Sequence, residues 1–114
     1  MKIVKLKDAQ KFSNSEKCNG LEYPIDELDI NLSSAIVTGR YPEKGYCVNE
    51  ECKEMVYIVE GSGTINKKGE TIEFSKDDVI FVDKGEAYYW DANCKMIMSC
   101  TPAWYAQQHK EVEG

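Results

Sequence analysis

Two stretches of the chain, Glu54-Met-Val-Tyr-Ile-Val-Glu60-Gly61-Ser62-Gly63 and Asp77-Asp-Val-Ile-Phe-Val-Asp83-Lys-Gly85, decide its fold. Each is a short apolar run of β-branched and aromatic residues with carboxylates at its ends, which is typical of a β-strand. Each is followed by glycine, which adopts the positive φ angles of tight turns without steric cost. The two stretches therefore predict neighbouring strands that end in chain reversals.

Strand patterns of the same kind recur along most of the chain, about ten residues apart, and this spacing is typical of an antiparallel sandwich or barrel. We expect strands at Ile30–Thr38, Glu54–Glu60, Gly63–Asn66, Glu70–Phe74, Asp78–Val82, Ala87–Asp91 and Lys95–Cys100. The intervening residues, including Gly61-Ser62-Gly63 and Asp91-Ala92-Asn93, are expected to reverse the chain. Short helical turns are expected only near the termini, in Lys7–Phe12 and Ala103–Lys110.

The length of 114 residues predicts one domain, residues 1–114, with a single hydrophobic core. Within it we expect an irregular N-terminal wrap at 1–29, since Gly20 and Pro24 interrupt any periodicity there. The barrel is expected to occupy residues 30–101 and a short C-terminal tail residues 102–114.

The composition excludes several classes of function. A net charge of −6 disfavours binding to nucleic acid or to an anionic membrane surface, both of which require a basic patch. No apolar run approaches the ~20 residues of a transmembrane helix, and charges interrupt the N-terminal residues, so we expect a cytoplasmic protein. The five cysteines lack Cys-x-x-Cys spacing and are expected to be free thiols.

The alternation along the first strand assigns its side chains to two faces. Glu54, Val56, Ile58 and Glu60 share one face, and Met55, Tyr57 and Val59 share the other. Because both faces are largely apolar, we expect the strand to be covered on both sides, between two packed sheets. Glu54 begins the strand and is expected to lie at the mouth of the barrel.

With these motifs in place, the chain resembles the cupin superfamily between about residues 38 and 101. The first cupin motif contains a glutamate, six residues and a glycine, and here Glu54 and Gly61 have that spacing. The second motif ends in Pro-x-Gly, two residues and a histidine, and here Asp83-Lys84-Gly85-Glu86-Ala87-Tyr88 has the same length. The resemblance implies an all-β fold, a single cupin-type jelly-roll β-barrel.

The resemblance also implies a metal site of three imidazoles and one carboxylate, but the imidazoles are missing at the matching positions. The first two histidine positions fall on Cys47 and Asn49, or on Val48 and Glu50 if the gap is one residue shorter. The third falls on Tyr88.

We therefore expect no cofactor and no tightly bound metal. If a divalent metal is bound, its ligands would be Glu54, Cys47, Asn49 and Tyr88.

A barrel mouth without metal is still a pocket, and we expect it to bind a small polar molecule. The expected ligand-binding residues combine aromatic area with a few orienting polar groups and are Glu54, Asn49, Tyr88, Trp90 and Cys47. The alternatives are a metal-dependent isomerase, lyase or dioxygenase with a Glu/Cys/Asn site, and a structural domain with a packed barrel. A metal-free acid–base enzyme using Glu54 and Tyr88 is a variant of the second.

The C-terminal tail is unusual because it carries large aromatic residues. Trp104 and Tyr105 follow Pro102, which ends the last expected strand. We expect them to cover the barrel or to form the interface of a homodimer. His109, the only histidine, is expected to be an exposed side chain of this tail. Arg40 is expected to meet either an anionic ligand or a surface carboxylate.

Overall fold

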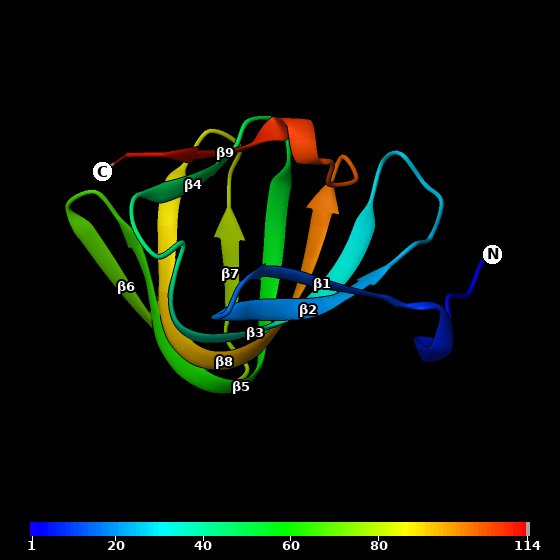
Figure 1. The fold of residues 1–114 in the computed structure, drawn as a ribbon, viewed down its shortest axis with the longest axis horizontal. Helices are drawn as coiled ribbons and strands as arrows, with labels where there is room; N and C mark the ends of the chain where they lie inside the picture. Colours follow the sequence, from blue (N-terminus) through cyan, green and yellow to red (C-terminus); the bar gives the residue numbers. More distant parts are fainter. Residues whose placement is uncertain (114) are drawn as a thin grey trace.

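The chain folds into a single strongly curled sheet, described by a computed structural model that covers residues 1–113 (Figure 1). The strands, all antiparallel to their neighbours, are β1 Gln10–Ser15, β2 Cys18–Tyr23, β3 Asn31–Tyr41, β4 Tyr46–Asn49, β5 Lys53–Lys67, β6 Glu70–Ser75, β7 Val79–Val82, β8 Ala87–Thr101 and β9 His109–Val112. Two single-turn 3-10 helices, η1 Leu6–Asp8 and η2 Ala106–Gln108, lie near the termini. The expected all-β barrel fold is confirmed.

β8 is the central strand of the barrel. Along its length it pairs with β3 on one side and β5 on the other, while its first residues also pair with β4. β4 in turn pairs with β9, so the C-terminal strand is attached to one end of the barrel (Figure 1). η2 and β9 lie across that end, which forms the mouth of the barrel.

The expected chain reversals at Gly61–Gly63 and Asp91–Asn93 are wrong, because β5 and β8 are continuous 15-residue strands. A register shift between Ile58 and Glu60 bends β5, and Gly61 follows it with a φ of 86°. A Cβ at Gly61 would lie 2.0 Å from the carbonyl oxygen of Asn93, so glycine permits the close approach of the two bent strands. The glycine marks a bend here and not a hairpin.

The N-terminal segment 1–29 is also more regular than expected, because β1 and β2 form a hairpin that extends the sheet next to β3. These strands lack a clear alternation of apolar and polar residues. β2 pairs with β3, and β1 pairs with β2. Gly20 packs against backbone, since a Cβ there would lie 1.9 Å from the carbonyl oxygen of Ser34. The tail 102–114 likewise contains a strand, β9, that the sequence did not predict.

The two faces of β5 differ sharply. Glu54, Val56 and Ile58 point into the barrel and are buried, with Ile58 completely inaccessible. Met55 and Tyr57 point outwards and are 51% and 41% exposed, so the expectation that both faces are covered is wrong for the folded chain. The core lies inside the curled sheet and not between two flat ones. Within the described residues, no helix is long and apolar enough to cross a membrane.

Candidate functional site

A cavity of about 190 Å³ lies inside the barrel, and Trp104 and His109 of the C-terminal segment form part of its wall. Its walls are largely aromatic, with side chains from β1, β3, β8 and the segment before η2. These aromatic residues are Phe12, Tyr41, Tyr88, Trp90 and Trp104. The polar residues include Asn31, Asn49, Glu54 and His109. Four of the five expected ligand-binding residues, Glu54, Asn49, Tyr88 and Trp90, therefore line one cavity.

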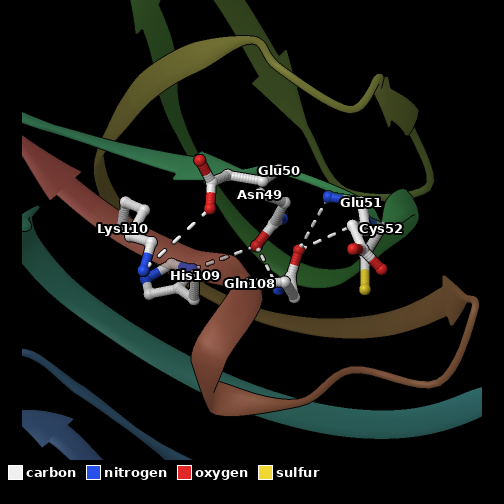
Figure 2. Close-up of polar contacts among 7 residues, drawn as sticks. All are labelled: Asn49, Glu50, Glu51, Cys52, Gln108, His109 and Lys110. Carbon is white, nitrogen blue, oxygen red and sulfur yellow. Dashed lines mark hydrogen bonds and ion pairs between the residues drawn. The ribbon is translucent and has the colours of Figure 1, made fainter.

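Asn49 lies at the centre of the polar wall and is only 1% exposed. Its Oδ1 accepts a hydrogen bond from Nε2 of Gln108 at 3.0 Å and lies 3.0 Å from Nδ1 of His109 (Figure 2). Its Nδ2 donates to Oε2 of Glu54 at 3.4 Å. Both ends of this buried amide are thus used, and they connect β4, β5 and β9.

Glu54 is a buried carboxyl group with no cationic partner among the described residues. Its Oε2 accepts hydrogen bonds from Asn49 and from the thiol of Cys100, the latter at 3.6 Å. Burial raises the pKa of Glu54, and these two hydrogen bonds oppose that effect only in part. The environment therefore favours the protonated, neutral carboxylic acid.

His109 is half-buried and lines the cavity, which contradicts the expectation of an exposed tail residue. It stands opposite Asn49 in the β4–β9 register, and its ring contacts Trp104 with centroids 5.7 Å apart. Burial lowers the pKa of His109, which favours a neutral imidazole near pH 7. Trp104 packs back on the barrel, as in the first of the two alternatives expected for the aromatic residues of the tail, whereas Tyr105 is exposed.

Gln108 holds this tail in place, and sequence reasoning missed it entirely. It is 2% exposed, and its Oε1 accepts the backbone N–H groups of Cys52 at 3.2 Å and Glu51 at 3.3 Å (Figure 2). An ion pair between Lys110 and Glu50, at 4.0 Å, adds an exposed contact beside it. A glutamine in a polar tail gives no signal in the sequence that it will be buried.

Tyr88 and Trp90 contact each other edge to face, with ring centroids 6.0 Å apart, and Trp90 also packs against Phe74. Burial raises the pKa of Tyr88 well above its ordinary value, so its hydroxyl stays protonated and is a hydrogen-bond donor. Tyr88 and Trp90 therefore pack against other aromatic rings and also line the cavity, two roles that the sequence left as alternatives.

Cys47 does not join the site. It is fully buried in the core next to Tyr41 and is absent from the cavity wall, and burial raises the pKa of its thiol to about 12. A thiol of this kind is a poor nucleophile and a poor metal ligand, because both roles require the thiolate. Cys47 is therefore separated from the other four expected ligand-binding residues, and its part in binding stays a prediction.

The donor set does not fit the metal that the cupin fold implies. Asn49 Oδ1 already accepts from Gln108 and contacts His109, and the environment of Glu54 favours its neutral form. Across the described residues, no group of three His, Cys, Asp or Glu side chains is close enough together to hold a metal ion. A protein site for zinc or iron normally supplies three or four deprotonated ligands.

Arg40 meets neither of its expected partners. Its guanidinium donates hydrogen bonds to the carbonyl oxygens of Pro42 and Gly45 and stacks on the ring of Tyr89, 3.7 Å from the centroid. It therefore has a structural role in the loop before β4 and lies outside the cavity wall.

Comparison with known proteins places this geometry in context. The model of the EutQ-like cupin domain matches residues 44–97. Streptomyces PAC13, solved with uridine and described as a nucleoside dehydratase, superposes with a TM-score of 0.88 at 16% identity, over 99% of this chain and 91% of that one. No curated protein sequence matches the chain significantly.

Two further enzymes have similar structures. Ectoine synthase from P. lautus gives a TM-score of 0.73 at 17% identity and covers 98% of this chain and 90% of its own. The polyketide cyclase RemF from Streptomyces resistomycificus gives 0.67 at 15% identity, with 95% and 89% covered. At these identities the likeness shows the shared fold alone.

Proposed function

We propose that the cavity inside this cupin-type barrel binds one small uncharged organic molecule. The observation that carries the proposal is the cavity itself, which combines aromatic walls with the buried polar groups of Asn49 and Glu54 and the half-buried His109. Sites for small molecules have this composition, in which apolar area provides affinity and a few polar groups fix orientation.

The size of the cavity limits the ligand. A cavity of 150 Å³ is large enough to bind benzene, so about 190 Å³ accommodates one ring with a few substituents. Tyr88 and Trp90 offer ring edges and faces for stacking. A larger ligand would require the segment from Trp104 to His109 to move.

The charge of the wall favours an uncharged ligand. The lining includes the carboxyl groups of Glu22 and Glu54, and no lysine or arginine is among the described residues that form it. A phosphate or carboxylate would therefore be buried without a cation, at a large cost in free energy. Oδ1 of Asn31 is buried without a hydrogen-bond partner in the described structure, and a hydroxyl or N–H of the ligand would satisfy it.

Uncharged nucleosides are the first ligands to test, because PAC13 shares this fold and was solved with uridine. The two alternatives from the sequence receive less support. The donor set argues against the hypothesis of a metal-dependent enzyme, and the cavity beside Glu54 argues against the hypothesis of a structural domain with a packed barrel.

The binding experiment uses an advantage of this chain, namely that both of its tryptophans, Trp90 and Trp104, line the cavity. Tryptophan emission is titrated with uridine, whose two rings would require the segment from Trp104 to His109 to move, and with a panel of uncharged single-ring metabolites, each paired with its phosphorylated form. We expect at least one uncharged compound to change the emission and its phosphorylated partner to bind at least tenfold more weakly.

The variant Glu54→Gln keeps the size of the side chain at the site, and Glu73→Gln makes the same change on the exposed hairpin strand β6. Only Glu54→Gln is expected to alter the affinity. The proposal is wrong if no uncharged compound changes the emission, or if phosphorylated partners bind equally well.

We also propose a homodimer, with an interface on the outside of the barrel and not on the tail. Large apolar residues of β3, β5 and β7 are 41–59% exposed there, namely Leu32, Ile36, Met55, Tyr57, Val79 and Phe81. A group of exposed apolar residues of this kind is typical of an interaction surface, and a stable dimer buries about 800 Å² on each partner. A cytoplasmic location stays a prediction.

A further inference from the structure

We propose that Glu22, Asn31 and Ser33 form a second polar subsite of the cavity, and that this subsite binds two adjacent hydroxyl groups on a ring of the ligand. The inference rests on the proposed binding function and deepens it, because it assigns the ligand to the uncharged vicinal diols. It is carried by the register of β2 and β3 and by an acceptor atom in the cavity wall that has no donor among the described residues.

The three side chains lie on the face of the sheet that lines the cavity. Asn31 and Ser33 are two residues apart on β3, and Leu32 between them points outwards and is 43% exposed. Ser33 is paired with Glu22 of β2, and paired residues of neighbouring strands point to the same side of a sheet. Their Cβ atoms are about 5 Å apart, and those of the diagonal neighbours Glu22 and Asn31 about 7 Å apart. Neighbouring substituents of a single ring can therefore reach both residues.

Two of these residues offer acceptors for which the protein supplies no donor. Oδ1 of Asn31 is buried and has no hydrogen-bond partner in the described structure. The carboxylate of Glu22 only accepts hydrogen bonds, and within residues 1–113 it forms no ion pair. A buried acceptor without a donor costs free energy. A molecule that brings donors to both positions removes this cost and is bound more tightly for that reason.

Hydroxyl groups match this set of side chains better than other donors do. A hydroxyl donates one hydrogen bond and accepts others, so it can donate to Glu22 and accept from the hydroxyl of Ser33. The amide of Asn31 carries the donor Nδ2 beside its acceptor, and an ammonium group, which has no acceptor, would leave Nδ2 unpaired. The match also holds if the amide is turned over, because a hydroxyl serves the nitrogen as well as the oxygen.

The register connects this subsite to the polar group around Asn49. Asn31 is paired with Cys100 of β8, and Cys100 is paired with Glu54 of β5. Neighbouring strands are about 4.8 Å apart, so the Cα atoms of Asn31 and Glu54 are no more than about 10 Å apart. A single ring fits between them, with its hydroxyl edge toward Asn31 and its other edge toward Glu54 and Asn49. The faces of the ring then meet aromatic side chains of the wall such as Trp90.

The first test needs no ligand and measures the thermal stability of Asn31→Leu, in which an apolar side chain of similar size replaces the amide. Because Asn31 serves the ligand and not the fold, removing its unpartnered acceptor should leave Tm unchanged or raise it. Asn93→Leu makes the same change on the exposed side of β8 and is the control. If Tm of Asn31→Leu lies more than about 4 °C below that of Asn93→Leu, Asn31 stabilises the fold and the inference is overturned.

The second test compares the binding of three uncharged probes that differ only in their hydroxyl groups, with tryptophan emission as the readout. The probes are cis-cyclohexane-1,2-diol, its 1,4-isomer and cyclohexanol. The two diols have the same size and the same number of hydroxyls, so only the spacing of the hydroxyls differs. We expect the 1,2-diol to bind about tenfold more tightly than either of the others, as for one additional hydrogen bond to a charged acceptor.

Variants of the subsite show where the preference for the 1,2-diol arises. Asn31→Leu and Glu22→Gln should each remove most of this preference, whereas Asn93→Leu should preserve it. Equal binding of the two diols, or a preference that survives in Asn31→Leu, overturns the inference but leaves the binding function intact. Absence of binding by every uncharged ring compound contradicts the binding function and the inference together.

Discussion

The inner and outer faces of β5 are built from alternate residues of one strand, yet they have opposite roles. The inner face carries buried apolar side chains and, at its start, the carboxyl group of Glu54. The outer face carries Met55 and Tyr57, which are exposed together with their neighbours on β7, Phe81 and Val79. Apolar character alone thus does not indicate burial within the chain, and the direction of curvature of the sheet decides which face becomes the core.

The largest expected difference between the two faces is the loss of stability when an inner side chain is removed. Ile58→Ala leaves a cavity in the core and is expected to lower the free energy of unfolding by about 2–5 kcal/mol. Met55→Ala, on the outer face of the same strand, should change it by no more than about 0.5 kcal/mol. Thermal unfolding separates the two, since each kcal/mol shifts Tm by about 4 °C in a domain of this size. Equal losses would mean that the two faces are buried alike.

The pH dependence of stability tests the polar end of the inner face. Burial raises the pKa of Glu54 above its ordinary value of 4.5, so its contribution to stability is complete below that value and is lost as the pH rises through the folded-state pKa. Glu54→Gln should therefore gain stability relative to the unmodified protein as the pH rises from about 4.5. A tenfold change in this protonation equilibrium corresponds to about 1.4 kcal/mol.

Denaturant unfolding from pH 5 to pH 9 measures this difference, with Glu73→Gln as a control for the change in net charge. His109 is present in both proteins, so its opposite dependence on pH cancels in the comparison. A difference that stays constant with pH would show that the carboxyl group of Glu54 is solvated in the folded state.

The smallest effect on the folded chain is expected on the outer face. Phe81→Lys changes a residue that is 52% exposed and should alter monomer stability by no more than about 0.5 kcal/mol. It should nevertheless weaken the proposed dimer at least tenfold, because it places a charge in the apolar face. Sedimentation at several concentrations measures the dimer, with Glu73→Lys on β6 as the control. A protein that is monomeric at every concentration contradicts the proposal.

The sequence predicted the parts of the fold that depend on local patterns. The alternation from Glu54 to Ile58 and the β5–β6 hairpin around Gly69 are visible in the chain itself. Gly61 misled the prediction because a positive φ angle serves a bend as well as a hairpin turn. The sequence did not predict β1 and β2, because their side chains do not alternate clearly and their register depends on pairing with neighbouring strands.

The candidate site was predictable only on the side contributed by the central strands. Asn49, Glu54, Tyr88 and Trp90 belong to motifs of recognisable spacing, and the structure brings them to one cavity. His109 meets Asn49 through the pairing of β4 with β9, across 60 residues of chain. No local pattern in the tail indicates that pairing, so the position of His109 in the cavity wall could not be predicted from the sequence.

The attachment of the tail through Gln108 makes the protein modular. The barrel strands up to residue 101 supply most of the cavity wall, including Glu54, whereas the segment from 102 to 112 supplies Trp104 and His109. The tail is attached to the barrel by the pairing of β9 with β4 and by the backbone N–H groups of Glu51 and Cys52. Exchanging this segment should therefore change the side chains of the cavity wall while the rest of the sheet keeps its register. The C-terminal segment is thus a suitable unit to exchange between related barrels and to redesign when the ligand specificity of this one is to be changed.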